Sequence, residues 1–197
     1  RLKEFHHEGI PIVIERMGYS RELCYEIFLQ DHSKGDELWE CLWQAGQDLN
    51  ISAGGPNIIL RLEGGILSYL SDLDRTNNPY EVGLDWMIDL DQEDDFIGKE
   101  ALREINIKGP LKKLMGAEIE ADPIYESNED HLPVLIDGKV VGSMNAMVYS
   151  PRLDKNLSYV FLDIEHARVG QEIIISSPDK DLKAKLVDLP WLDRAKK

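Results

Sequence analysis

The alternation of apolar and polar positions divides the chain into a mixed first part and a β-rich second part. Short β-branched runs at residues 10–16 and 24–30 are typical of strands, and residues 17–23 form the loop between them. Ser33 and Asp36 resemble a capping box that opens a helix. The buried face of that helix is predicted from apolar residues at i, i+3, i+4 and i+7, which are Leu38, Cys41, Leu42 and Ala45.

Further elements are predicted before residue 108. A helix follows Gly54-Gly55-Pro56 and ends at Gly64-Gly65, because proline suits a first helical turn and glycine a helix end. A turn at residues 77–79 precedes a strand region over residues 80–90, and residues 96–103 form a short helix.

Helical periodicity disappears after Lys108, Gly109 and Pro110, so we place a domain boundary there, between residues 1–108 and 109–197. Six short β-rich runs follow, at residues 114–119, 132–136, 140–149, 157–164, 172–176 and 182–187. Asp137-Gly138 is a hairpin turn between two of them. The pattern predicts an α+β chain that ends in a small antiparallel barrel or sandwich.

Composition excludes several classes of function. The formal net charge is −15, which argues against nucleic-acid binding, because phosphate neutralisation needs clustered Lys and Arg. No apolar run approaches the roughly 20 residues that cross a bilayer, so no membrane role is expected. The chain starts at Arg1 without a leader, and its two cysteines form no metal pattern. We therefore expect a fragment of a cytoplasmic protein with free thiols.

Common catalytic and cofactor motifs are missing. Gly98-Lys99 lacks the rest of a phosphate loop, and no dinucleotide fingerprint or nucleophile elbow occurs. The run His6-His7-Glu8 lacks the i, i+4 pair of ligands that a helical metal site would use. No metal site is predicted.

Glu26 is the most informative single residue. Strand alternation places it on one face with Cys24 and Phe28, where a partly desolvated carboxylate needs hydrogen-bond donors. Two interpretations remain open. Arg16, Arg21, another basic residue or solvent satisfies the carboxylate, or a ligand with adjacent N–H groups does.

Several segments, in order along most of the chain, resemble the glycine-cleavage T-protein family. Residues 16–27 resemble its R-x-G-Y-S/T-G-E-x-G-F/Y-E-I/L pattern, and residues 61–65 resemble R-L-E-A-G. Residues 78–84 and 95–102 resemble T-P-x-E-A-G-L and D-F-I-G-R/K-E-A-L. Near the end, residues 150–156 resemble S-P-x-L-x-K-N.

The resemblance implies a partial folate-binding lobe followed by a C-terminal β-barrel. It also implies tetrahydrofolate as cofactor, with Glu26 binding the pterin and Tyr19 and Tyr69 lying near the folate. Family members carry an arginine four positions before the R-L-E-A-G arginine, where it holds substrate or folate. That position is Asn57 here, and the departure removes a fixed positive charge.

Two further features bear on the branch of the family. Arg21 to Cys24 replace the loop G-E-x-G, so both glycines are lost. Residues 77–81 and 150–153 are closer to the dimethylsulfoniopropionate demethylase branch, which moves a methyl group from a sulfonium to tetrahydrofolate.

The implied function is transfer of an aminomethyl or methyl group from a small-molecule donor to tetrahydrofolate. In the family, the catalytic aspartate lies in the N-terminal half, which has no counterpart here, so no catalytic residue is predicted. We expect the N-terminal half of the same protein to be a partner of this chain. Without that half, we expect the fragment to be inactive. The alternatives are a noncatalytic folate-binding module and the folate lobe of a dimethylglycine or sarcosine dehydrogenase.

Overall fold

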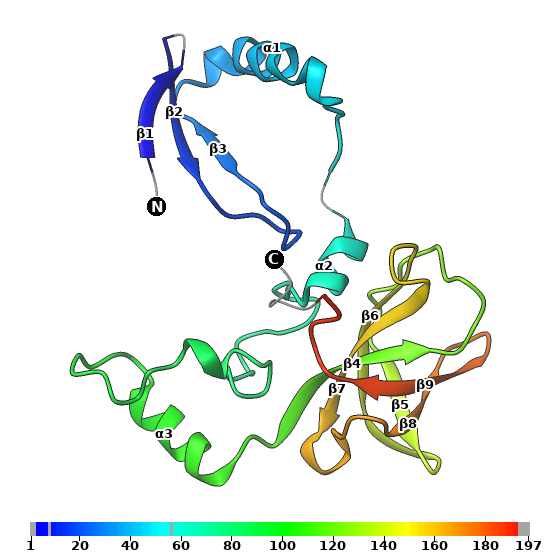
Figure 1. Ribbon diagram of the computed structural model, residues 1–197. Helices are drawn as coiled ribbons and strands as arrows, with labels where there is room; N and C mark the ends of the chain where they lie inside the picture. The colour runs from blue at the N-terminus through cyan, green and yellow to red at the C-terminus, as the bar shows by residue number, and fades with distance from the viewer. Residues whose placement is uncertain (1–2, 8, 56, 193–197) are drawn as a thin grey trace. The chain divides into compact units, whose positions relative to one another are not determined.

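The computed structural model describes residues 3–7, 9–55 and 57–192, which form an α+β fold with many antiparallel strands and few helices (Figure 1). The fold class predicted from the sequence is therefore confirmed. The chain divides into two compact units, residues 1–61 and 62–197. Among the described residues, no helix combines the length and the apolar character needed to span a bilayer.

The first unit is a three-stranded antiparallel sheet with a helix packed on one face. The strands are β1 (Lys3–His7), β2 (Ile10–Glu15) and β3 (Glu26–Leu29), in the order β1-β2-β3. Helix α1 spans Gly35–Gly46, flanked by the 3-10 turns His32–Lys34 and Gln47–Leu49. The strand β1 had no counterpart among the predicted elements.

The core of the first unit is small. Ile10, Ile12 and Leu38 are buried together, and partly buried apolar side chains of β2, β3 and α1 pack around them. Of the predicted buried face of α1, only Leu38 and Cys41 contact this core, while Leu42 and Ala45 are exposed. The prediction that Leu42 and Ala45 are buried was therefore wrong, because the three-stranded sheet covers only one edge of the helix.

The start of α1 also differs from the prediction. The carboxylate of Asp31 accepts hydrogen bonds from the Ser33 hydroxyl at 2.7 Å and the Ser33 amide at 3.0 Å. These bonds lower the pKa of Asp31. Asp31, and not Ser33, therefore caps the turn that leads into the helix.

The second unit contains a closed antiparallel barrel in the order β4-β7-β6-β5-β8-β9. Its strands are β4 (Lys112–Ile119), β5 (Leu132–Ile136), β6 (Lys139–Ser150), β7 (Lys155–Asp163), β8 (Glu172–Ser176) and β9 (Asp181–Val187). The unit also contains helix α3 (Lys99–Lys108), the 3-10 turns Asp85–Met87 and Ile164–His166, and the end of α2 (Ile58–Gly64). All six predicted β runs are confirmed, and the structure selects the barrel over the sandwich.

Local chemistry explains why the barrel strands were predictable. Asp137 and Gly138 both have positive φ, as a tight hairpin turn between β5 and β6 requires. Alternate side chains of each strand point inward, and Met144, Leu162 and Ile175 are fully buried in the barrel core. Burial of these apolar residues is the main stabilising contribution of this unit.

The strand expected over residues 80–90 was wrong. The Asn78 side chain accepts hydrogen bonds from the amides of Tyr80 and Glu81, and Leu84 donates its amide to the Pro79 carbonyl. These local bonds curl the chain into turns, because an asparagine side chain competes with a strand for backbone partners. Glu81, which looked like a strand residue, is instead buried in this turn.

The last helix starts and ends later than predicted. Gly98 has a φ of +91°, which breaks the helix on its N-terminal side, so α3 begins at Lys99 and continues to Lys108. Gly109 follows with positive φ, and β4 begins three residues later. The domain boundary expected after Lys108 stays a prediction.

Candidate functional site

Glu26 is the first residue of β3 and is half-buried. Its partner across the β2–β3 ladder is Glu15, so two carboxylates stand directly opposite each other. Like charges at such a position repel, and the pair destabilises the sheet. Sequence reasoning missed Glu15, because the predicted strands 10–16 and 24–30, paired from their ends, would place Tyr25 rather than Glu26 opposite it.

Neither carboxylate is neutralised by a side chain that the structure describes. Among the described residues, the structure records no ion pair and no side-chain hydrogen bond for Glu15 or Glu26. Alternation puts Glu26 on the face of β3 that carries Phe28, which is 48% exposed, while Ile27 and Leu29 face the α1 core. Of the two interpretations left open for Glu26, pairing with an arginine finds no support among the described residues.

Tyr19 lies in the loop between β2 and β3, with 41% of its surface exposed. Gly18 and Cys24 lie so close together in this loop that a Cβ atom on Gly18 would clash with the side chain of Cys24. The Cys24 sulfur also lies 3.0 Å from the hydroxyl oxygen of Ser20. Cys24 thus occupies the space beside Gly18 and stiffens the loop that carries Tyr19.

Arg21 occupies a glycine-like conformation in the same loop, with a φ of +59°. The sequence comparison with the T-protein pattern places a glycine at this position. A non-glycine residue in the left-handed region costs about 1 kcal/mol. The loop therefore keeps the backbone shape of the glycine pattern at some cost in stability.

Replacing Arg21 by glycine should consequently stabilise the chain. We expect the free energy of unfolding to rise by up to about 1 kcal/mol, because the strain at positive φ is relieved and is only partly offset by added backbone entropy. Denaturant titration would measure this. Arg16→Gly, at a residue with ordinary backbone geometry, is the control and should not stabilise; equal effects of the two changes would contradict the strain argument.

Tyr69 lies in the second unit, on a tightly bonded turn. The buried Asp72 accepts a hydrogen bond from the Ser68 amide at 2.7 Å, and Leu70, with a φ of +75°, donates its amide to the Leu73 carbonyl. Asn145 of β6 donates to the Asp72 carbonyl at 3.2 Å. The turn is thereby anchored on the barrel, and it leaves Tyr69 56% exposed.

A polar cavity of about 240 Å³ lies next to this turn. It is lined by the loop of residues 70–77 and by side chains of or near the barrel strands, including Lys112, His131, Ser143 and Asn145. Groups of both charges meet there, so the cavity suits a small polar ligand group.

Asn57 precedes helix α2 and caps it. Its side-chain oxygen accepts a hydrogen bond from the Leu60 amide at 2.9 Å, and its carbonyl accepts one from the Arg61 amide. An asparagine at this position stabilises a helix start by satisfying a free amide. The Pro56 expected in the first turn lies outside the described residues.

The four predicted site residues fall in different units: Tyr19, Glu26 and Asn57 belong to the first, and Tyr69 to the second. Their roles as cofactor-binding residues stay predictions. Within the first unit, the loop of Tyr19 leads directly into the strand that begins with Glu26.

Glu63, in the last turn of α2, was not singled out by sequence reasoning. It is 1% exposed, accepts a hydrogen bond from the Ser150 hydroxyl at 2.6 Å, and lies 3.6 Å from the Arg152 guanidinium. The structure therefore brings together the R-L-E-G-G segment and the S-P-R-L turn that follows β6. The contacts of Glu63 with Ser150 and Arg152 hold the end of α2 against the barrel.

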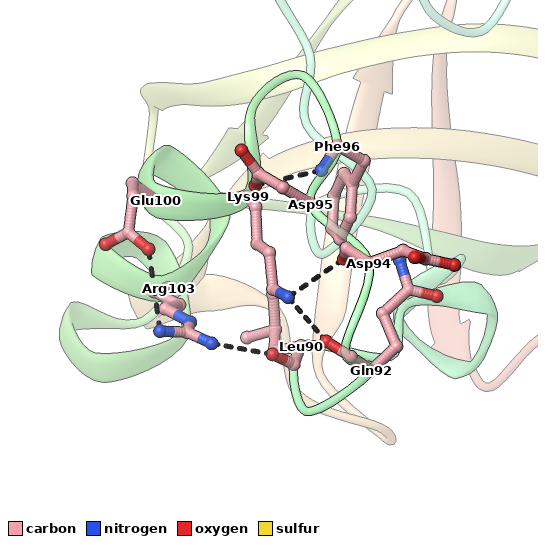
Figure 2. Close-up of polar contacts among 8 residues, drawn as sticks. All are labelled: Leu90, Gln92, Asp94, Asp95, Phe96, Lys99, Glu100 and Arg103. Carbon is pink, nitrogen blue, oxygen red and sulfur yellow. Dashed lines mark hydrogen bonds and ion pairs between the residues drawn. The ribbon is translucent and has the colours of Figure 1, made fainter.

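Lys99, in the D-F-I-G-K segment, also has a structural role (Figure 2). Its ammonium group donates to the carbonyls of Gln92 at 2.7 Å and Asp94 at 3.1 Å. Arg103 donates to the Leu90 carbonyl at 2.8 Å. The two cations hold the loop before α3, and two of the three ammonium N–H groups of the buried Lys99 are used by backbone carbonyls.

Metal ligands do not gather within the described part of the chain: no group of three or more His, Cys, Asp or Glu side chains is placed to hold an ion there. Of the run His6-His7-Glu8, the last residue lies outside the described residues.

Known proteins resemble the chain over most of its length. The model of the GCVT N-terminal domain matches residues 1–92, and that of the glycine cleavage T-protein C-terminal barrel domain matches residues 112–193. A dimethylsulfoniopropionate demethylase of Ruegeria pomeroyi is 35% identical over 91% of this chain and 48% of its own length. An aminomethyltransferase of Symbiobacterium thermophilum is 32% identical over 93% of this chain and 48% of its own length.

A solved structure agrees on the fold. The glycine cleavage system aminomethyltransferase T from Bartonella henselae superposes with a TM-score of 0.80 at 21% identity, covering 92% of this chain and 50% of that one. The chain spans about half the length of the curated relatives it matches. With both family models matched in order, the chain belongs to the glycine cleavage T-protein family.

Proposed function

We propose that this chain is the folate-binding and barrel portion of a tetrahydrofolate-dependent one-carbon transferase. The reaction is transfer of an aminomethyl or methyl group from a small-molecule donor to tetrahydrofolate. The part of the family's length that this chain does not span supplies the catalytic group, so these residues alone are inactive. The setting is the cytoplasm, in keeping with Cys24 and Cys41, neither of which forms a disulfide.

The pair of Glu15 and Glu26, which no described side chain neutralises, is the observation that carries this proposal. Two repelling carboxylates weaken a sheet, so their presence together is explained when a ligand donates hydrogen bonds to one of them. A pterin offers adjacent N–H donors on one edge, which a carboxylate accepts as two parallel hydrogen bonds. The exposed ring of Phe28 on the same face adds an apolar surface for a flat heterocycle.

Tyr19, Tyr69 and Asn57 complete the proposed cofactor contacts. The two tyrosines are exposed and lie on turns whose backbone is held in place, so little backbone conformational entropy is lost when a ligand contacts them. Asn57 offers its amide nitrogen to a carboxylate of the ligand, since its oxygen caps α2. This contact is weaker than the salt bridge that an arginine would form.

Two types of small-molecule one-carbon donor fit the family. Relatives include both a dimethylsulfoniopropionate demethylase and aminomethyltransferases at similar identity. We favour a methyl donor of the sulfonium type, because residues 77–81 and 150–153 follow the demethylase pattern. Transfer needs the donor carbon held close to the folate nitrogen, which is mainly a positioning task.

The test uses a completed chain, in which the part of the Ruegeria pomeroyi demethylase outside its match to this chain is joined to residues 1–197. Calorimetry with 5-methyltetrahydrofolate should show binding to the completed chain, and methyl-transfer assays should compare dimethylsulfoniopropionate with an aminomethyl donor. A completed chain that is folded, by circular dichroism, yet binds no folate would refute the proposal. The unmodified chain is the control for turnover and should show none.

A further inference from the structure

Residues 84–111 are locally ordered but have almost no core of their own. Within this segment only Lys99 is buried, and its ammonium group is held by two backbone carbonyls and lies 5.7 Å from the centre of the Phe96 ring. Large apolar residues are instead exposed, among them Met87 at 66%, Ile97 at 104% and Leu111 at 80%. Clamped loops with exposed apolar side chains are typical of a surface that is covered by a partner.

One face of α3 forms a groove within this segment. Ala101, Ile105 and Leu111 line its apolar floor, and Glu104 and Lys108, paired at 3.0 Å, stand at its rim. The groove has a volume of about 460 Å³. Ile107 lies on a different face of the helix and is 84% exposed, so it provides an internal comparison.

The charge around the groove selects the kind of partner. Residues 84–108 carry eight acidic side chains and three basic ones. Of the basic ones, Lys99 is used by backbone carbonyls, and Arg103 and Lys108 are paired with glutamates. A surface that covers this segment would therefore combine an apolar ridge with basic flanks.

We propose that this groove is the docking surface for the half of the T-protein fold that this chain does not span. The length argues for this occupant, because relatives matched over 91% and 93% of this chain are about twice as long. The clamps of Lys99 and Arg103 hold the loop in one conformation in advance, which lowers the entropy lost on docking. The inference rests on family membership and not on the one-carbon chemistry, so it can fail while folate binding stands.

Hydrogen exchange of the unmodified chain gives the first test. Amides of α3 should exchange at least tenfold faster than those of β6 and β7, at any protein concentration. In the completed chain, protection of residues 97–111 should rise at least tenfold. Protection of α3 already present in the unmodified chain would overturn the proposal: if concentration-dependent, a second copy fills the groove, and if not, residues of this same chain do.

Leu111→Asp and Ile107→Asp are a matched pair that makes the groove itself testable. In the completed chain, Leu111→Asp should remove the added protection, and Ile107→Asp should keep it. In the unmodified chain, neither change should lower Tm by more than about 2 °C, because both side chains are largely exposed, at 84% for Ile107 and 80% for Leu111. A larger loss of Tm for Leu111→Asp there, or equal effects of both changes on docking, would contradict the assignment. If the fusion does not fold, the Tm comparison still decides whether Leu111 is already packed.

Discussion

Replacing Glu26 by glutamine in the completed chain is expected to weaken 5-methyltetrahydrofolate binding about tenfold to a hundredfold. Glutamine keeps the shape of the side chain but loses the charge, and a hydrogen bond to a charged group contributes about 1.5–3 kcal/mol. Only one of two parallel acceptors remains, since the amide nitrogen donates. Calorimetry measures the change in Kd directly.

The same substitution is expected to stabilise the apoprotein. Removing one charge from the Glu15–Glu26 pair relieves repulsion across the β2–β3 ladder, worth about 0.2–1 kcal/mol. Higher stability with weaker binding is the signature of a site that sacrifices stability for a ligand.

Glu15→Gln is the matched control for this prediction. It removes a charge from the same pair and should stabilise the sheet by a similar amount, yet change the folate Kd by less than about threefold, because the resemblance assigns the pterin to Glu26. Unchanged affinity in Glu26→Gln would show that the pterin role of this residue is wrong. A large loss in Glu15→Gln instead would assign that role to its neighbour.

Replacing Glu63 by alanine is expected to lower the free energy of unfolding by about 3 kcal/mol. The Ser150 hydroxyl, which is fully buried, loses its acceptor, and the guanidinium of Arg152 loses its buried counter-charge. Removal of the side chain also leaves a cavity between the end of α2 and the barrel. Urea titration of the purified chain measures the loss.

Glu118→Ala is the control for the Glu63 prediction. Glu118 forms an ion pair with Lys155 at 2.7 Å, but both side chains reach solvent, so we expect a loss of less than about 1 kcal/mol. The loss in the free energy of unfolding for Ser150→Ala should lie between the losses for Glu63→Ala and Glu118→Ala. A double-mutant cycle of Glu63 with Ser150 should show a coupling energy above about 0.5 kcal/mol. A Glu63→Ala protein as stable as the Glu118→Ala protein would mean that the contact does not hold α2 on the barrel.

The barrel illustrates what sequence reasoning reaches well. Strand β9 alternates apolar and polar residues, and β4, β6 and β7 carry longer apolar runs. Asp137-Gly138 specifies a tight turn by its own backbone preference. Such signals are local, so they are readable without knowing the partner strand. Barrel closure was not readable from the residues alone, because it depends on pairing between β4 and β9, which are far apart in the chain.

Two of the mistaken predictions share one cause. The strand expected at residues 80–90 was overruled by the side chain of Asn78, and the capping residue of α1 moved from Ser33 to Asp31. In each case several short-range hydrogen bonds competed, and the sequence does not rank them.

The sequence by itself determined the family, the α+β class, the six barrel strands and Glu26 as a residue of interest. These follow from local periodicity, turn chemistry and ordered motifs. Only the tertiary structure decided that Glu15 stands opposite Glu26, that Glu63 reaches Ser150 87 positions later, and that Asn57 caps α2. The physical reason is that charge repulsion and burial depend on which side chains become neighbours, and that is set by strand register and packing rather than by any local pattern.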